Sequence, residues 1–151
     1  MSVTLDKVYE SSAEKRTVVL WVSRHPPLPS QIDVLERKLG GVVVYQLAGI
    51  IPNAEAVIEY VKKLNATVVV PVLPLSIIAR LAELAKSTGF TILLAKMEAI
   101  AATKDPEEVK RLVSENPWAR TITTYADGVI RVFEFRCFER LIRVELVTEP
   151  F

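Results

Sequence analysis

The sequence has very few of the residues that cross-link small proteins or bind transition metals. Cys137 is the only cysteine and His25 the only histidine. One cysteine cannot form an intramolecular disulfide, and one cysteine with one histidine cannot form a zinc cluster. A metal bound by carboxylates alone is not excluded by this count, but no pattern in the sequence indicates one. We predict neither a metal nor a cofactor.

Long apolar runs are also missing. No run approaches the ~20 apolar residues that cross a bilayer, and charged residues recur within positions 6–16, where a signal peptide has its apolar core. We therefore expect a cytoplasmic protein without membrane contact. The 19 basic and 18 acidic residues nearly cancel, so no overall field attracts duplex nucleic acid, and an anionic ligand must be held locally. The few Asn and Gln residues beside many Lys, Arg and Glu are a balance reported for thermophile proteins.

Glycine is absent where the common nucleotide-binding loops need it. The first apolar strand is followed by Ser-Arg-His-Pro-Pro, residues 23–27, in the place of a dinucleotide fingerprint or a Walker loop. No G-x-S-x-G elbow follows a strand either, which argues against an α/β-hydrolase. A domain without these loops is more often a binding or regulatory module.

Strand and helix patterns alternate from residue 17 onward. Residues 17–22 are continuously apolar and β-branched, which is typical of a central strand buried on both faces. Pro29 suits the first turn of the helix that follows, and Gly40-Gly41 ends it. Two more units repeat this pattern. We predict strands at 42–46, 67–73 and 91–95, helix N-caps at Asn53 and Ser76, and helix ends at Asn65 and Gly89.

The pattern changes after residue 98. Asp105 and Pro106 are typical of a helix start, and the helix is expected to end near Glu115. Strands at 120–125 and 129–136 flank an Asp-Gly step, which is a hairpin signal. Residues 141–147 alternate apolar and charged side chains, which predicts a further strand.

These elements predict one α/β domain spanning residues 1–151. Strands that alternate with helices through short loops form parallel sheets covered by helices on both faces. We expect a Rossmann-like three-layer sandwich with a mainly parallel sheet and a C-terminal antiparallel hairpin extension. The parallel βα core covers residues 17–98, and the helix and antiparallel strands cover residues 105–151.

Ligands of such sheets bind at the carboxyl ends of the strands, where the strand order reverses. Ser23, Arg24 and His25 lie at this position, directly after the predicted central strand. A guanidinium suits phosphate, and a nearby helix N-terminus adds backbone donors. An anion site is the natural hypothesis. The alternative is that Arg24 and His25 belong to a solvated loop held by prolines.

The loops after the other strands supply further candidates. Gln46, Pro74, Ser76 and Lys96 are the candidate ligand-binding residues. Ser76 has an alternative role as the N-cap of its own helix, and Lys96 could pair with Glu98 instead of a phosphate. Cys137 is far from His25 in the sequence, so we interpret it as structural or inert rather than as a nucleophile.

Two segments carry a resemblance to a known family. Residues 20–26, Leu-Trp-Val-Ser-Arg-His-Pro, followed by Gln31, resemble the opening of small CRISPR-associated ring nucleases of the Csx type. Residues 70–75, Val-Pro-Val-Leu-Pro-Leu, look like the strand of these proteins that ends in Leu-Pro. The two matches fall within residues 17–95. The predicted strands at 120–147 go beyond the minimal family pattern.

The resemblance implies a CARF-like homodimer that binds a cyclic oligoadenylate, a second messenger of antiviral defence. It further implies metal-independent cleavage in which the ribose 2′-hydroxyl is the nucleophile. Arg24 would then bind phosphate, His25 would act as acid, base or donor, and Ser23 with Ser76 would orient the ring. Positioning and fixed cations can supply most of such a rate enhancement.

An alternative function follows from a second resemblance. Proteins of archaeal and bacterial mobile elements begin with a similar Trp-x-Ser-Arg-His step, which implies no activity. On this hypothesis the chain is a non-enzymatic interaction or regulatory protein, whose strands between residues 125 and 147 pair edge to edge with a partner or with a second copy.

Overall fold

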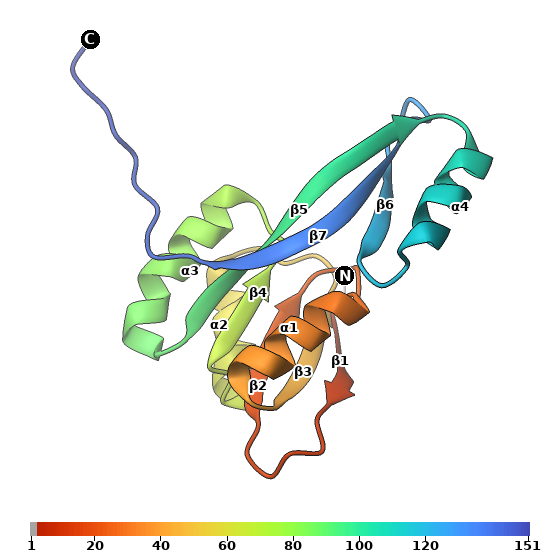
Figure 1. The fold of residues 1–151 in the computed structure, drawn as a ribbon. Coiled ribbons are helices and arrows are strands. Elements are labelled where there is room, and N and C mark those ends of the chain that lie inside the picture. Colours follow the sequence, from red (N-terminus) through yellow and green to blue (C-terminus); the bar gives the residue numbers. More distant parts are fainter. Residues whose placement is uncertain (1–2) are drawn as a thin grey trace.

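A seven-stranded sheet is the centre of the computed structural model, which describes residues 3–151 (Figure 1). The order of its strands is β1-β3-β2-β4-β5-β7-β6. The strands are β1 (Thr4–Glu10), β2 (Thr17–Val22), β3 (Val42–Ala48), β4 (Val68–Pro71), β5 (Thr91–Thr103), β6 (Arg120–Thr124) and β7 (Ile130–Arg140). The helices are α1 (Pro29–Leu39), α2 (Ala54–Leu64), α3 (Leu75–Thr88) and α4 (Pro106–Glu115).

The sheet is mixed, so the expectation of a mainly parallel sheet is wrong. β3, β2, β4 and β5 run parallel to one another, as predicted. β1 pairs antiparallel with β3, and β7 pairs antiparallel with both β5 and β6. The antiparallel strands are therefore added at both edges of a parallel centre. The broader prediction, a mixed α/β fold, is confirmed.

β1 was not predicted from the sequence. Its pairing with β3 shifts register between Lys7 and Tyr9, because a bulge interrupts the strand there. A bulge breaks the two-residue alternation that marks a strand, so the pattern around it is hidden. Leu5 nevertheless packs against the main hydrophobic cluster.

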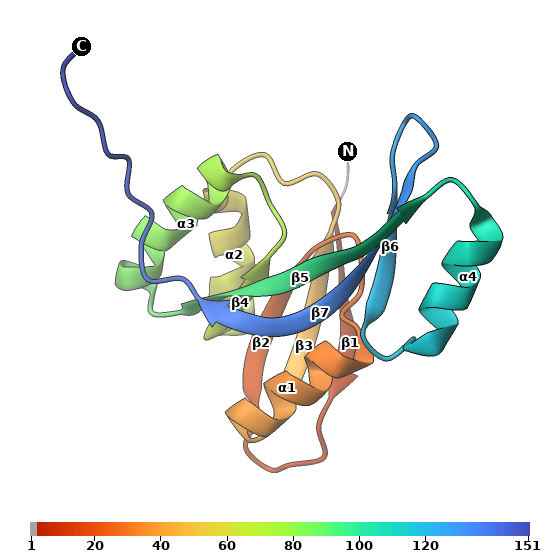
Figure 2. The ribbon, with the colours of Figure 1, turned by 45° about the horizontal axis from the view of Figure 1, so that its top comes forward.

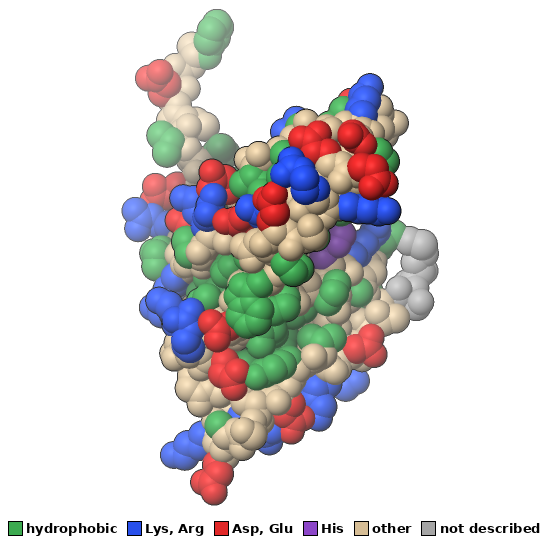
Figure 3. All heavy atoms as spheres, turned by 45° about the vertical axis from the view of Figure 1, so that its right-hand side comes forward, with side chains coloured by type: hydrophobic (Ala, Val, Ile, Leu, Met, Phe, Trp, Pro, Cys, Tyr) green, Lys and Arg blue, Asp and Glu red, His purple; other side chains and the backbone are tan. Residues whose placement is uncertain are grey.

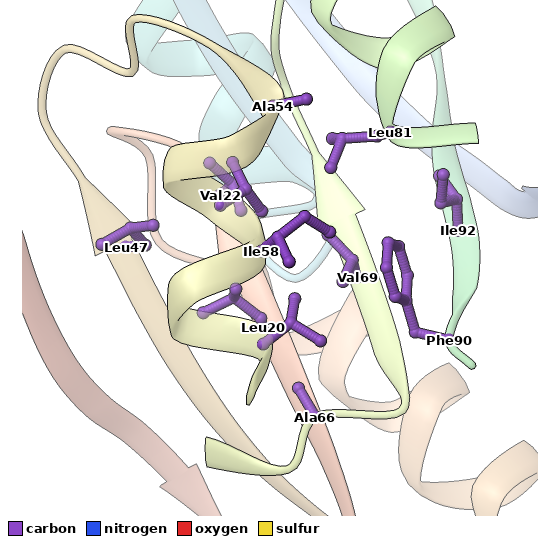
Figure 4. Packing of buried hydrophobic residues seen from close by; sticks show 12 residues of the cluster. Leu20, Val22, Leu47, Ala54, Ile58, Ala66, Val69, Leu81, Phe90 and Ile92 are labelled. Atoms are coloured by element: carbon purple, nitrogen blue, oxygen red, sulfur yellow. The ribbon is translucent and has the colours of Figure 1, made fainter. Parts of the chain in front are cut away.

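β2 is buried on both faces, as its continuous apolar sequence predicts. Leu20 and Val22 pack on one side with residues of α2 and α3 (Figure 4). Val19 and Trp21 pack on the other side with Leu35 of α1. The helices therefore cover opposite faces of the parallel strands, and β2 lies between two hydrophobic clusters.

The helix boundaries follow the predicted capping residues in most cases. The Asn53 side chain accepts a hydrogen bond from the amide of Ala56 over 2.9 Å. Asn65 ends α2 in the left-handed conformation, with φ of 54°. The prediction for Ser76 is wrong, because α3 begins at Leu75 and its N-cap is Pro74. Pro74 has an extended backbone, with φ of −56° and ψ of 148°, and makes no side-chain cap hydrogen bond.

β5 is much longer than predicted, and the C-terminal part of the chain pairs with it. It continues to Thr103 and pairs with β7 along most of its length. The two strands curve away from α2 and α3, and β6 and α4 lie at their far end (Figure 2). The hairpin between β6 and β7 is confirmed, with the amide of Tyr125 donating to the carbonyl of Val129 over 2.9 Å.

Residues 141–147 do not form the predicted strand. The amide of Leu141 donates to the carbonyl of Ile92, and the chain then leaves the sheet in an extended form (Figure 1). The alternation of apolar and charged residues is present, but beyond Leu141 the segment forms no backbone hydrogen bond with a strand among residues 3–151. None of the helices within residues 3–151 has the length and apolar character required to cross a bilayer.

Candidate functional site

The strand order reverses at β2. The chain leaves β2 and returns as β3 on one side, and the next strand, β4, lies on the other side of β2. In parallel sheets the crevice at such a reversal, outside the carboxyl ends of the strands, is where ligands bind. The segment from Ser23 to His25 follows β2 directly and therefore lies at this crevice.

Hydrogen bonds fix the backbone of the turn after β2. The hydroxyl of Ser23 accepts from the amide of His25 over 3.1 Å, and the indole of Trp21 donates to the carbonyl of His25 over 2.9 Å. Gln46 of β3 donates from its side-chain amide to the carbonyl of Ser23 over 2.9 Å. Ser23 is buried, whereas the side chains of Arg24 and His25 are exposed. The turn is thus anchored, and its two basic side chains are available to a ligand.

A largely apolar hollow of about 410 Å³ lies on one side of this turn. Its volume falls within the range of small-molecule sites, which is roughly 300–1,000 Å³. Most of its lining is aliphatic or aromatic, with a few hydroxyl, amide and imidazole groups among them. The residues that line it include Trp21, Ser23, His25, Leu28, Gln31, Val72, Leu73, Leu94, Met97, Thr121, Ile122, Thr123 and Phe133.

The C-terminal hairpin supplies one wall of this apolar hollow. Thr121, Ile122 and Thr123 of β6 line it, and the start of β6 is tied to α1 because the amide of Ser30 donates to the carbonyl of Trp118 over 3.0 Å. In Figure 3 the imidazole of the only histidine, in purple, lies at the edge of an apolar area. The hairpin, which we predicted as a C-terminal extension, therefore forms part of the site.

Gln31 is a polar residue of the hollow that sequence reasoning did not identify as a ligand-binding candidate. Only 4% of it is exposed, and its side-chain carbonyl accepts from the amide of Leu28 over 2.7 Å. Among residues 3–151, the one hydrogen-bond acceptor of its side-chain NH₂ is the sulfur of Met97, over 3.7 Å. Because a thioether is a weak acceptor, this NH₂ group can donate to a ligand. The one sequence signal is its place as the third residue of α1.

A smaller hollow of about 250 Å³ lies on the other side of the turn. Ser23 and His25 border both hollows, and Arg24 borders only the smaller one. No described carboxylate lines either hollow. Within residues 3–151 Arg24 also forms no ion pair, whereas most of the other arginines do. The uncompensated positive charge of Arg24 therefore favours an anion at this hollow.

The N-terminus of α1 does not supply the backbone donors that the sequence suggested. The amides of Gln31 and Ile32 donate to the carbonyl of Leu28, and that of Ser30 donates to Trp118. Pro29 has no amide hydrogen. The donors of this helix end are therefore occupied, and an anion must depend on the side chains of the turn.

The remaining candidates lie outside both hollows. Gln46 holds the turn by its bond to Ser23, so it positions the site rather than lining it. Pro74 and Ser76 are exposed at the start of α3, just after Leu73, which lines both hollows. Lys96 is exposed on β5 and lines neither hollow, and Glu98 pairs with Arg136 instead of Lys96. Cys137 is exposed on β7.

Within residues 3–151, no three His, Cys, Asp or Glu side chains gather closely enough to hold a metal ion. The chemistry available at the turn is that of a guanidinium, an imidazole and a hydroxyl. Comparison of the chain with models of protein families, with curated proteins and with solved structures found no match.

Proposed function

We propose that the protein binds a cyclic oligoadenylate at the turn after β2. The observation that carries the proposal is the pair of hollows that share Ser23 and His25, one largely apolar and the other bordered by Arg24 without a carboxylate. A nucleotide has a flat aromatic base joined to a charged phosphate. The base matches the apolar hollow and the phosphate matches the smaller hollow. The single turn between the hollows matches the short link between base and phosphate.

The base would occupy the apolar hollow. Phe133 and Ile122 offer aromatic and aliphatic surface for a base beside the buried indole of Trp21, and stacking on aromatic side chains contributes about 1–3 kcal/mol per base. The NH₂ group of Gln31 would donate to a ring nitrogen of adenine. This donor would distinguish a base from a plain hydrocarbon and would add to the hydroxyl and imidazole groups of the hollow.

The phosphate would lie over the smaller hollow. Arg24 would bind it with its guanidinium, whose planar fork matches two phosphate oxygens. His25 borders both hollows and would therefore stand between the base and the phosphate.

A ring of several nucleotides is larger than the apolar hollow of one chain. We propose that two copies of the chain face one another across the ring, as the resemblance to CARF-like ring nucleases suggests. The parallel strands β3, β2, β4 and β5, with α1 on one face and α2 and α3 on the other, support a Rossmann-like three-layer reading of this part of the fold. Signalling by such rings in antiviral defence would take place in the cytoplasm.

Cleavage would need no group that the chain lacks. The ribose 2′-hydroxyl would attack the neighbouring phosphorus, forming the O2′–P bond while the P–O5′ bond breaks. The 2′-hydroxyl proton leaves to a base, and a proton reaches the departing 5′ oxygen, so the products are a 2′,3′-cyclic phosphate and a 5′-hydroxyl. His25 would carry one of these protons and Arg24 would stabilise the charge on the phosphate.

The test is titration of the purified protein with cyclic tetra-adenylate and cyclic hexa-adenylate, followed by analysis of the products. We expect saturable binding, a large loss of affinity in Arg24→Ala, and no loss in Arg140→Ala. Arg140 is the matched control because it is also exposed and without an ion pair among the described residues. Loss of product in His25→Ala with binding retained would assign cleavage to the imidazole. Absence of binding by the unaltered protein would reject the proposal.

A second candidate function is that of a non-enzymatic interaction protein. The observation that favours it is the exposed apolar segment after β7, which includes Ile142, Leu146 and Val147. If neither ring binds, this surface carries the function and the turn after β2 is a structural feature. The alternative predicts that substitutions at Arg24 and His25 change no interaction of the protein.

A further inference from the structure

The segment after β7 is extended but is paired with no strand among the described residues beyond its first amide. We call residues 141–147 the tail strand. Its first amide, that of Leu141, donates to Ile92, and no further backbone hydrogen bond joins it to the described residues. Both figures of the ribbon show the chain leading away from the sheet here (Figures 1 and 2). Such a row of unpaired backbone groups is a template for pairing with another strand.

The side chains in the middle of the tail strand differ between its two faces, and the face that carries the charges is flanked by Leu141 and Val147. Ile142, Val144 and Leu146 share one face, because successive side chains of a strand point to opposite sides. Leu146 is 91% exposed and Ile142 is 67% exposed. The opposite face carries Arg143 and Glu145, whose side chains form an ion pair of 2.7 Å. A continuous apolar face is unfavourable in water, so we expect this face to pack against another apolar surface.

We propose that the tail strand pairs antiparallel with the tail strand of a second copy of this chain, around a two-fold axis at Val144. In this register Val144 lies opposite Val144 of the partner subunit. Ile142 lies opposite the partner subunit's Leu146, which joins the two apolar faces. Arg143 lies opposite the partner subunit's Glu145, so both charges meet an opposite charge across the axis.

The neighbouring symmetric registers are worse. A two-fold axis at Arg143 places two arginines directly opposite each other, and an axis at Glu145 does the same with two glutamates. Like charges directly opposite each other on a sheet are destabilising. Registers shifted by one residue set the apolar face of one copy against the charged face of the other. The sequence of the tail strand therefore favours a two-fold axis at Val144. It also favours a second copy of the chain as the partner of the tail strand.

The pairing does not depend on the ligand proposed above. It joins two copies through the end of β7, and the hollows at the turn after β2 contain no tail residue. The self-association is therefore tested without any nucleotide. Failure of the tail-strand pairing and failure of ring binding are separate results.

Charge reversal tests the register. The mass of the full chain in solution is measured by light scattering for the unaltered protein and for four variants. We expect the unaltered protein and the double variant Arg143→Glu/Glu145→Arg to be dimers, since the opposite charges still meet. Arg143→Glu and Glu145→Arg alone place like charges opposite and should be monomers. An equimolar mixture of these two single variants should form a mixed dimer. Lys104→Glu, an exposed charge reversal far from the tail strand, should stay dimeric.

Cross-linking tests the position of the axis. In the background Cys137→Ser, Val144→Cys places two thiols opposite each other, with Cα atoms roughly 4.5–5.5 Å apart, which a disulfide can bridge. Leu146→Cys is the matched control, because its two copies lie roughly 14 Å apart along the strands. Oxidation should link the first variant and not the second. A monomeric unaltered protein, dimers that persist in both single charge variants, or equal cross-linking of the two cysteine variants would overturn the proposal.

Discussion

The side-chain amide of Gln46 donates a hydrogen bond to the carbonyl oxygen of Ser23 over 2.9 Å. Gln46 lies on β3, in register with Trp21 of the neighbouring parallel strand β2, and Ser23 directly follows β2. The bond therefore ties the turn that carries Arg24 and His25 to the adjacent strand. In this arrangement Gln46 would act on a ligand through the position of the turn, without contact of its own.

Replacement of this amide by an apolar side chain of similar length should loosen the turn. We expect Gln46→Met to weaken binding of a cyclic oligoadenylate roughly fivefold, because a lost hydrogen bond costs about 1 kcal/mol. Calorimetric titration of the variant and of the unaltered protein measures the change. A Gln46→Met variant that binds as tightly as the unaltered protein would show that the turn holds its shape without the bond.

The two tryptophans allow the apolar hollow to be observed separately. Trp21 lines this hollow, and Trp118 is exposed outside it. In Trp118→Phe the indole of Trp21 is the only remaining tryptophan, and its fluorescence should change when an adenine base stacks beside it. Inorganic phosphate, which has no base, is the control and should leave the emission unchanged. A ring that binds without altering Trp21 emission would place the base elsewhere.

Acid should weaken the fold through Glu134. Its carboxylate accepts from the guanidinium of Arg120 over 2.8 Å, and this bond lowers the pKa of Glu134 below its ordinary value. A carboxyl group with a lowered pKa in the folded state stabilises the fold above the pKa of the unfolded state, about 4.3 for Glu. This contribution disappears as the pH falls through the lower pKa of the folded state.

Urea unfolding across this acidic range measures the effect. We expect the free energy of unfolding to fall less steeply with decreasing pH in Glu134→Gln than in the unaltered protein. Glu139→Gln is the matched control on the same strand, because Glu139 is exposed and has no ion-pair partner among the described residues. If the free energy of unfolding depends on pH equally in the two variants, Glu134 does not contribute to the acid sensitivity.

Two leucines of α3 test the hydrophobic cluster beneath it. Leu81 is 0% exposed, and Leu75 is 68% exposed. We expect Leu81→Ala to lower the free energy of unfolding by about 2–5 kcal/mol, because it removes buried methyl groups and leaves a cavity. Leu75→Ala should change it by no more than about 0.5 kcal/mol. Urea unfolding compares the two, and similar losses would mean that the cluster does not pack as described.

Local signals predicted much of the fold. Residues 17–22 indicated the central strand because burial on both faces leaves a continuously apolar sequence. Asn53, Asn65 and Gly89 marked helix ends because capping depends on one side chain or one backbone angle. The length of β5 was not predicted, because residues 96–103 are stabilised by β7, which is far away in the sequence.

Only the local part of the candidate site was predicted from the sequence. Ser23, Arg24 and His25 follow a recognisable central strand, so the rule for parallel sheets leads to them directly. Thr121, Ile122 and Phe133 enter the apolar hollow only because the antiparallel hairpin folds back over the carboxyl end of β2. No local pattern reports such a contact. Lys96 was selected by its place after a strand, but β5 continues past it and exposes its side chain away from the hollows.

We propose that His25 faces a ligand-binding crevice, and because His25 is the single histidine its imidazole can be observed directly. The imidazole contributes one set of ring resonances to the NMR spectrum. We predict that titration with cyclic tetra-adenylate or cyclic hexa-adenylate moves these resonances in a saturable way, and that Arg24→Ala shifts the midpoint to a higher ligand concentration. Imidazole resonances that stay fixed at every concentration of both rings would contradict the claim.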